Sequence, residues 1–257
     1  MRPSPGALRR DLAVWLVREI VSCAVAHPRS ASPGFGSVAR AIGRFRLPSP
    51  EMRPPTIGLV GGIGAGKSSV ARILAGSGCV VCDSDALARE ALDDPSVAGA
   101  IRERWGESVF RPGTDASGAG ALDRRAVAAL VFERAEERRW LESVIHPWIE
   151  RRRRDLFRDA PADTRARVID APLLLEAGLD DRCDAILFVD APRVLRLARL
   201  AAARGWTDAE LARREAAQWP LDRKRQRATH VIENVADESH LRTQVLAALD
   251  AIAPRSR

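Results

Sequence analysis

Residues Gly61 to Ser68 have the pattern G-x-x-x-x-G-K-[ST], which is typical of loops that bind the phosphates of nucleoside triphosphates. The glycines allow the backbone to curl so that successive N–H groups point at phosphate oxygens. Lys67 can reach the β- and γ-phosphates, and the Ser68 hydroxyl can bind Mg²⁺. We therefore predict a catalytic role for Lys67, a metal-binding role for Ser68, and contacts to ATP from Gly62, Ile63, Gly64, Ala65, Gly66, Lys67, Ser68 and Ser69.

The residues around this loop predict the elements that must position it. Residues 56–60 read as a short buried strand, and residues 69–75 read as a helix. Strand, loop and helix in this order place the positive N-terminal end of the helix at the phosphates. The glycine spacing does not fit the dinucleotide fingerprint G-x-G-x-x-G, so the pattern favours a triphosphate over a dinucleotide.

Two carboxylates follow the next apolar run. Residues 79–82 predict a second strand, and Asp83 and Asp85 come directly after it. In an open parallel sheet, the carboxyl ends of the strands face the ligand crevice. A carboxylate there can accept a proton from an attacking hydroxyl or hold magnesium through water. We expect Asp83 or Ser84 to cap the following helix, and Asp85 to carry the chemistry.

The overall charge argues against a nucleic-acid partner. The formal net charge is +7, but residues 1–51 hold eight arginines against three acidic residues, which leaves a net of +2 for the other 206 residues. That remainder has no strong field to attract a polyanion. The run of four arginines at 151–154 is expected to be a solvated helix end. No apolar run approaches the roughly 18 residues that cross a bilayer, so no membrane association is predicted.

The four cysteines show no disulfide pattern. Cys79 and Cys82 form a C-x-x-C, which could indicate a redox or zinc site, but they lie in an apolar run with no second pair nearby. Buried thiols in a reducing compartment are the favoured interpretation, and a cytoplasmic location is expected.

Strands and helices alternate along the remaining chain. Further strands are predicted at 168–170, 185–189 and 231–232, and helices at 86–92, 96–105, 123–132, 136–157, 192–203, 207–218 and 238–252, with a glycine-rich turn at 113–120. This order predicts an α/β fold with a five-stranded parallel sheet covered by helices on both faces. A helical acceptor-binding part is expected at about 86–165 and a lid at about 192–220, within a domain spanning 52–257.

Residues 1–51 differ from the rest in composition. A helix is conceivable at 8–25, followed by a segment rich in Pro, Ser and Gly. We favour an upstream start-site artefact with Met52 as the true start, then a disordered extension, and last a targeting peptide, because no cleavage pattern is evident.

Several motifs together resemble those of the dephospho-coenzyme A kinase family. The resemblance covers nearly everything outside the extension, and it implies the P-loop NTPase fold. The motifs are the doubled glycine of the loop; Asp83-x-Asp85-x-x-Ala88-Arg89; Leu122-Asp123-Arg124; Val131-Phe132; Trp140-Leu141; His146-Pro147; Asp170-x-Pro172-Leu173-Leu174-x-Glu176; Val189-Asp190-x-Pro192; Ala217-Gln218-x-Pro220; and Lys224, Ala228, Val231-Ile232 and Asn234.

The resemblance implies transfer of the ATP γ-phosphate to the ribose 3′-hydroxyl of dephospho-CoA, with Mg²⁺, as the last step of coenzyme A synthesis. It implies Asp85 as the base or the group that positions the hydroxyl, and Asp83, Arg89, His146, Leu174 and Glu176 at the acceptor. The alternatives are purely structural: a packing role for His146 at a helix bend and a helix-capping role for Glu176. Asp170 resembles an acidic Walker B residue, although family members do not all keep an acid there.

The lid and the base pocket depart from the family pattern. The arginine-rich lid should close over the phosphates and exclude water. Where the family often has Arg-Asp-Gly, this chain has Arg204-Gly205, so either Arg204 or Arg199 contacts the phosphates, and we predict both as candidates. Thr229 replaces an acidic residue common in the family, and Asn234 is expected to contact the nucleotide.

Two other functions stay open at this point. Another small-molecule P-loop kinase, acting on a nucleoside monophosphate or a sugar, would share the loop and lid but lack the acceptor motifs. A nucleotide-switched ATPase or GTPase belongs to a different class, and a GTPase should show an N-K-x-D motif, in which neither Lys67 nor Lys224 lies. The sequence does not indicate an oligomeric state.

Overall fold

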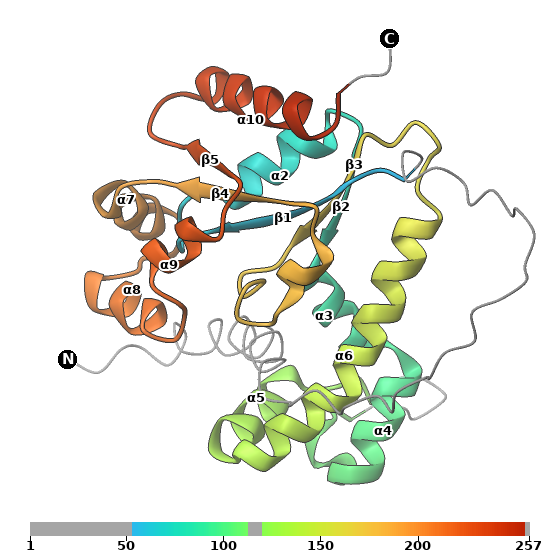
Figure 1. The fold of residues 1–257 in the computed structure, drawn as a ribbon. Helices are drawn as coiled ribbons and strands as arrows, with labels where there is room; N and C mark the ends of the chain where they lie inside the picture. The colour runs from blue at the N-terminus through green and yellow to red at the C-terminus, as the bar shows by residue number, and fades with distance from the viewer. Residues whose placement is uncertain (1–52, 113–119, 255–257) are drawn as a thin grey trace, which may run out of the picture.

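A five-stranded parallel sheet forms the centre of the molecule (Figure 1), as the sequence predicts. The computed structural model describes residues 53–112 and 120–254; the extension at 1–51, Met52 and most of the glycine-rich turn at 113–120 lie outside the described residues. The strand order is β2-β3-β1-β4-β5, with β1 (Thr56–Gly61), β2 (Cys79–Asp83), β3 (Ala166–Asp170), β4 (Ala185–Asp190) and β5 (His230–Glu233). The continuous apolar runs of β1 and β4 are buried along nearly their whole length, as expected for strands covered on both faces.

Helices cover both faces of this sheet (Figure 1). On one face, α2 (Lys67–Ala75) and α10 (Glu238–Ile252) pack on β1, β3 and β4 through an apolar cluster that includes Leu74, Val168 and Leu187. On the other, Leu174, Ile186 and Phe188 pack against residues around α9 (Leu221–Gln226). Helix α9 was not predicted, because Leu-Asp-Arg-Lys-Arg-Gln contains no apolar stripe.

Four helices build a second apolar core beside the sheet, in the part predicted to bind the acceptor. They are α3 (Ser84–Asp93), α4 (Pro95–Trp105), α5 (Arg124–Glu133) and α6 (Ala135–Arg158). Trp105 and Trp140 meet edge to face with ring centroids 4.9 Å apart and pack on this core. The arginines at 151–154 are exposed except for Arg153, which is buried and pairs with Glu150, so that part of the prediction was wrong.

The predicted lid contains α7 (Arg193–Arg204) and α8 (Asp208–Glu215), which follow β4. Within the described ranges, no helix is both long and apolar enough for a bilayer span. Cys79 and Cys82 are buried free thiols, as expected, and burial raises the pKa of Cys82 to about 12. A thiol held so far from its ionised form is a poor redox or metal-binding group.

Candidate active site

The phosphate loop follows β1 and leads directly into α2. Gly66 is the N-cap residue, with φ 96°, and no side chain caps the helix. The Ser69 N–H donates to the Gly66 carbonyl at 3.0 Å, and the N–H groups before it, of Lys67 and Ser68, lie at the helix start where they can donate to a ligand. Glycine is required here, because a Cβ at Gly66 would lie 2.1 Å from Nδ2 of Asn234 and the backbone is left-handed.

Side chains distant in sequence fix the direction of two peptide groups in the loop. Nη1 of Arg196 donates to the Ile63 carbonyl at 3.2 Å, and Nδ2 of Asn234 donates to the Ala65 carbonyl at 2.7 Å. In a trans peptide, the C=O of one residue and the N–H of the next point in opposite directions. The N–H groups of Gly64 and Gly66 therefore point away from this scaffold, as a phosphate cradle requires.

Only one of the two candidate lid arginines lies at the loop. Nη2 of Arg199 donates to the Asn234 carbonyl at 2.9 Å, and its Nη1 donates to the Ala65 carbonyl at 3.4 Å. Arg204 instead lies at the exposed end of α7, with its guanidinium 5.3 Å from the Trp206 ring centroid. The structure thus brings Arg199 to the loop and leaves Arg204 outside it.

Asn234 is buried and forms part of the loop's support. In addition to its bond to Ala65, its backbone N–H donates to the Asp190 carbonyl at 2.8 Å. The side chain therefore packs against the outer side of the loop. Thr229, in the predicted base region, bonds both the N–H and the carbonyl of Ile186 at 3.0 Å, which anchors the chain just before β5.

Acidic side chains meet Lys67 at the carboxyl edge of the sheet. Asp83 and Asp170 are register partners at the ends of β2 and β3, and Asp85 lies in the first turn of α3. Burial raises the pKa of Asp170 to about 6, against the opposing attraction of Lys67, and repulsion from Asp83 and Asp85 adds to the rise. Because each of these charges affects the Asp170 carboxyl, Lys67, Asp83 and Asp85 lie near it at the carboxyl edge of the sheet.

The expected cap is also present. Oδ1 of Asp83 accepts from the Ala86 N–H at 2.9 Å and caps α3. This leaves Asp85, half-buried one residue inside the helix, as the carboxylate with the predicted chemical role.

The oxygen donors at this edge suit magnesium. Within the described residues, no group of three or more His, Cys, Asp or Glu could hold a metal ion alone. Magnesium in kinases is held by one or two carboxylates together with waters and substrate phosphates, so it needs no such cage. The hydroxyl of Ser68, which is exposed, and the carboxylates of Asp85 and Asp170 fit that requirement.

Two predicted acceptor residues lie on helices beside this edge. Arg89 is exposed on α3, four residues after Asp85 and therefore on the same face of the helix. His146 is half-buried in the middle of α6, directly before Pro147. The helix continues through Pro147 from residue 135 to residue 158, so His146 is held within a continuous helix.

The loop after β3 holds the other two predicted acceptor residues. The Leu174 side chain is completely buried and contacts the position of Gly58 in β1, so it has no surface to offer a ligand. Oε1 of Glu176 accepts from the Trp219 N–H at 2.8 Å and pairs with Nζ of Lys224 at 2.8 Å. Glu176 caps no following helix, and its Oε2 is buried without a hydrogen-bond partner among the described residues.

Sequence reasoning missed the roles of Arg196 and Lys224. Arg196 is one of several arginines in the lid, and no local pattern separates it from its neighbours. Lys224 is 1% exposed, and it also donates to Oε1 of Gln218 at 3.0 Å. A usable signal existed for Lys224, because it and Lys67 are the only lysines in a chain with 41 basic residues.

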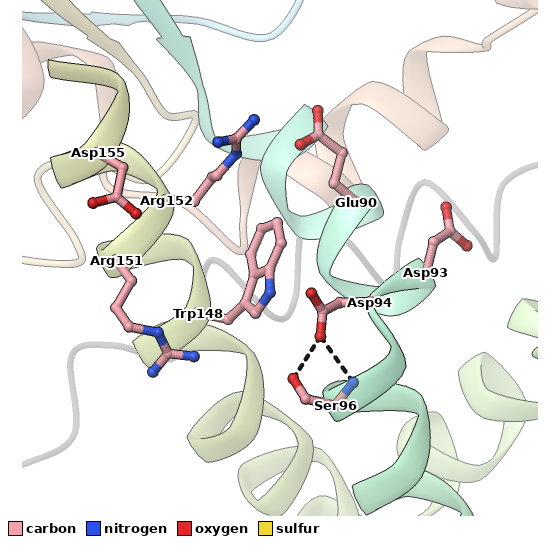
Figure 2. Close-up of a pocket in the computed structure, with 8 residues that line it drawn as sticks. All are labelled: Glu90, Asp93, Asp94, Ser96, Trp148, Arg151, Arg152 and Asp155. Carbon is pink, nitrogen blue, oxygen red and sulfur yellow. Dashed lines mark hydrogen bonds between the residues drawn. The ribbon is translucent and has the colours of Figure 1, made fainter. Parts of the chain in front are cut away.

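A cavity of about 660 Å³ lies elsewhere, between α6 and the junction of α3 and α4 (Figure 2). It is lined by Glu90, Asp93, Asp94, Ser96, Trp148, Arg151, Arg152 and Asp155. Asp94 bonds the N–H of Ser96 at 2.9 Å and caps α4. None of the predicted site residues lines this cavity.

Comparisons with known proteins agree with the geometry. The family profile described as dephospho-CoA kinase matches residues 55–239. A dephospho-CoA kinase from a Synechococcus strain is 43% identical over 194 residues, which cover 75% of this chain and 94% of that protein. The dephospho-CoA kinase of Deinococcus radiodurans is 39% identical, with 80% and 96% of the two chains covered.

A solved structure gives the same result. The crystal structure of TT1252 from Thermus thermophilus has a TM-score of 0.65 and 36% sequence identity, and the match covers 77% of this chain and 97% of that one. The dephospho-CoA kinase of Campylobacter jejuni has a TM-score of 0.55 at 18% identity, which shows the same fold. With a profile match over more than half of its residues and relatives of this similarity, the chain belongs to the dephospho-CoA kinase family.

Proposed function

We propose that this protein transfers the γ-phosphoryl group of ATP to the ribose 3′-hydroxyl of dephospho-CoA, which gives coenzyme A and ADP. The observation that carries the proposal is the combination of family membership with an uncapped helix start at Lys67 facing the carboxylates after β2 and β3. The reaction completes coenzyme A synthesis. Its substrates and the free thiols of the described residues favour a cytoplasmic location.

On the donor side, the loop residues from Gly62 to Ser69 bind the β- and γ-phosphates through backbone N–H groups. Lys67 stabilises the negative charge on the transferring group, and Arg199 approaches the phosphates from α7. Phosphoryl transfer leaves little covalent chemistry to the protein, so fixed positions and opposing charge supply most of the rate. The Ser68 hydroxyl would hold magnesium bound with ATP, and the metal would supply positive charge against the phosphates.

On the acceptor side, Asp85 receives the proton of the 3′-hydroxyl as the new O–P bond forms and the bond to ADP breaks. The proton then leaves to solvent. Arg89 lies on the same helix face, where its guanidinium can bind the phosphates of dephospho-CoA. His146 and Oε2 of Glu176 are the next candidates for acceptor contacts, and Asp83 completes the edge as the cap of α3.

A coupled ADP-release assay tests the proposal. ATP and Mg²⁺ are supplied with dephospho-CoA, AMP, CMP, shikimate or no acceptor, and the product is identified by mass. We expect ADP release that depends on dephospho-CoA, with one phosphate added to it. Turnover with AMP, CMP or shikimate alone, or equal turnover without acceptor, would refute it. Proteins that start at Met1 and at Met52 are compared, because the start-site hypothesis predicts equal activity.

A further inference from the structure

Arg196 connects three separate segments of the protein. Its side chain is buried, with 3% of the residue exposed. Its Nε donates to the Ala191 carbonyl after β4 at 3.1 Å, and its Nη1 donates to the Ile63 carbonyl in the phosphate loop at 3.2 Å. The same Nη1 pairs with Glu215, the last residue of α8. One guanidinium therefore touches the core, the loop and the lid.

Helix α8 also reaches the loop through an apolar contact. Ile63 packs in a small buried cluster with Leu200, Trp206 and Leu211, of which Leu211 belongs to α8. The carbonyl of Ile63 is held by Arg196, and its side chain is held by this cluster. The position of α8 thus affects both sides of one loop residue.

The packing beside Ile63 leaves little room for an alternative arrangement. A Cβ built at Gly62 would lie 3.2 Å from Cδ and from Nη1 of Arg196. The Arg196 side chain therefore packs closely against the loop backbone. A buried guanidinium also keeps its acceptors, because an unpaired buried charge is strongly unfavourable.

We propose that Arg196 is a positioning residue for phosphoryl transfer, which orients the Ile63–Gly64 peptide toward the phosphates and links that orientation to α8 through Glu215. This inference rests on the proposed function only for the identity of the acceptor. The carbonyl of Ile63 points at Arg196, so the N–H of Gly64 points to the opposite side, where the phosphates bind. When α8 is displaced, Arg196 loses its carboxylate partner and the loop loses this support.

The test compares Arg196→Met and Glu215→Ala with Arg193→Ala. Arg193 is the matched control because it lies on α7 and pairs with Asp208 and Glu215 of α8, but contacts no loop residue in the described structure. Affinity for a non-hydrolysable ATP analogue is measured by calorimetry, and kcat and both KM values by ADP release. Urea unfolding shows whether each variant is folded.

We expect Arg196→Met to weaken binding of the ATP analogue by about tenfold and to lower kcat by about a hundredfold. A loss of this size is usual when one hydrogen-bond donor to the reacting group is misplaced. The KM for dephospho-CoA should stay within about twofold, since the acceptor residues are untouched. Glu215→Ala should weaken ATP binding by about threefold, although it contacts no nucleotide, and Arg193→Ala should change it less. Arg196→Lys should recover part of the loss.

Equal effects of Arg193→Ala and Glu215→Ala on ATP affinity would overturn the proposal, as would equal changes in both KM values in Arg196→Met. If Arg196→Met does not fold, Glu215→Ala tests the same connection from its half-buried partner. Binding of the ATP analogue requires no acceptor, so the comparison of ATP affinities among the variants does not depend on the proposed function. A wild-type protein that binds ATP but does not phosphorylate dephospho-CoA would refute the proposed function alone.

Discussion

The donor and acceptor sides of the site are held in place by different forces. On the donor side, the buried Arg196 and Asn234 and the half-buried Arg199, from α7 and the end of β5, hold individual carbonyls of the phosphate loop. On the acceptor side, α3 to α6 pack around an apolar core of their own, which meets the sheet at Cys82 of β2. The acceptor residue Arg89 is exposed there.

This difference follows from what each side must recognise. A triphosphate is bound by N–H groups whose directions matter, so each peptide of the loop needs a specific hydrogen bond behind it. A large acceptor is bound over a broad surface, and non-directional packing tolerates small movements of a helix. We therefore expect substitutions on the donor side to change the KM for ATP sharply. Substitutions on the acceptor side should change the KM for dephospho-CoA moderately.

The largest effect is expected at Lys67. Lys67→Met removes the cation proposed to stabilise the transferring phosphoryl group, so kcat should fall by about 10³-fold, which is typical for loss of one transition-state contact. Coupled ADP release measures it. Arg72→Met is the control, because Arg72 is a cation of the same helix that pairs with Glu238 on the surface. A similar loss in both variants would mean that overall charge, rather than position in the loop, determines the rate.

The second effect concerns the buried ion pair between Glu176 and Lys224. Glu176 comes from the loop after β3, and Lys224 comes from α9, beyond the lid. Lys224→Met leaves a buried carboxylate without its cation, so the free energy of unfolding should fall by about 3 kcal/mol. Urea unfolding with far-UV detection measures the change.

A double variant separates the pair from the packing around it. Glu176→Met with Lys224→Met removes both charges together, and most of the lost stability should return. If the double variant is less stable than Lys224→Met alone, side-chain shape rather than the ion pair holds this junction.

A crossed pair of substitutions tests the comparison directly. Asn234→Ala removes the donor to the Ala65 carbonyl, so the KM for ATP should rise by about tenfold while the KM for dephospho-CoA stays within about twofold. Arg89→Gln should do the reverse, with about a fivefold rise in the KM for dephospho-CoA. Steady-state kinetics with each substrate varied give both values, and a joint rise of both KM values in either variant would contradict the separation.

The sheet and the loop could be predicted from the sequence because their signals are local. Apolar runs followed by polar ends mark each strand, and the pattern from Gly61 to Ser68 marks the position of the phosphate loop. The cap by Asp83 was predicted for the same reason, since it involves residues within one turn.

Contacts between distant segments could not be predicted in this way. The choice between Arg199 and Arg204 depends on which face of α7 lies against the loop, and the order of arginines along the sequence does not show which side chain faces inward. Leu174 was expected at the acceptor, yet the turn after β3 directs it completely into the core. Glu176 was expected either there or as a cap, and its partners Trp219 and Lys224 lie more than 40 residues away.

The smallest effect is expected at Asp170, and it should appear as a gain in stability. The folded pKa of this carboxyl is raised from 3.8 to about 6, mainly by burial, so its ionisation opposes folding once the pH exceeds the unfolded pKa. Asp170→Asn removes this cost and should stabilise the metal-free protein by about 1–2 kcal/mol at pH 7.5. The gain should be small at pH 4, close to the unfolded pKa, absent well below that pKa, where the carboxyl is neutral in both states, and complete above about pH 6.5.

Urea unfolding in EDTA at several pH values, on the wild type and Asp170→Asn side by side, measures this difference. Asp250→Asn is the control, since Asp250 pairs with Arg165 at 2.7 Å on the opposite side of the sheet and is more than half exposed. If the gain is the same at pH 4 and pH 7.5, packing and not ionisation is its cause. Alternatively, the stability gain of Asp170→Asn grows from pH 4 to pH 7.5 while its phosphoryl-transfer rate falls below that of the wild type. That result would mean that the carboxylates at the sheet edge serve the chemistry at a cost in stability, whereas the polar side chains behind the phosphate loop are hydrogen-bonded.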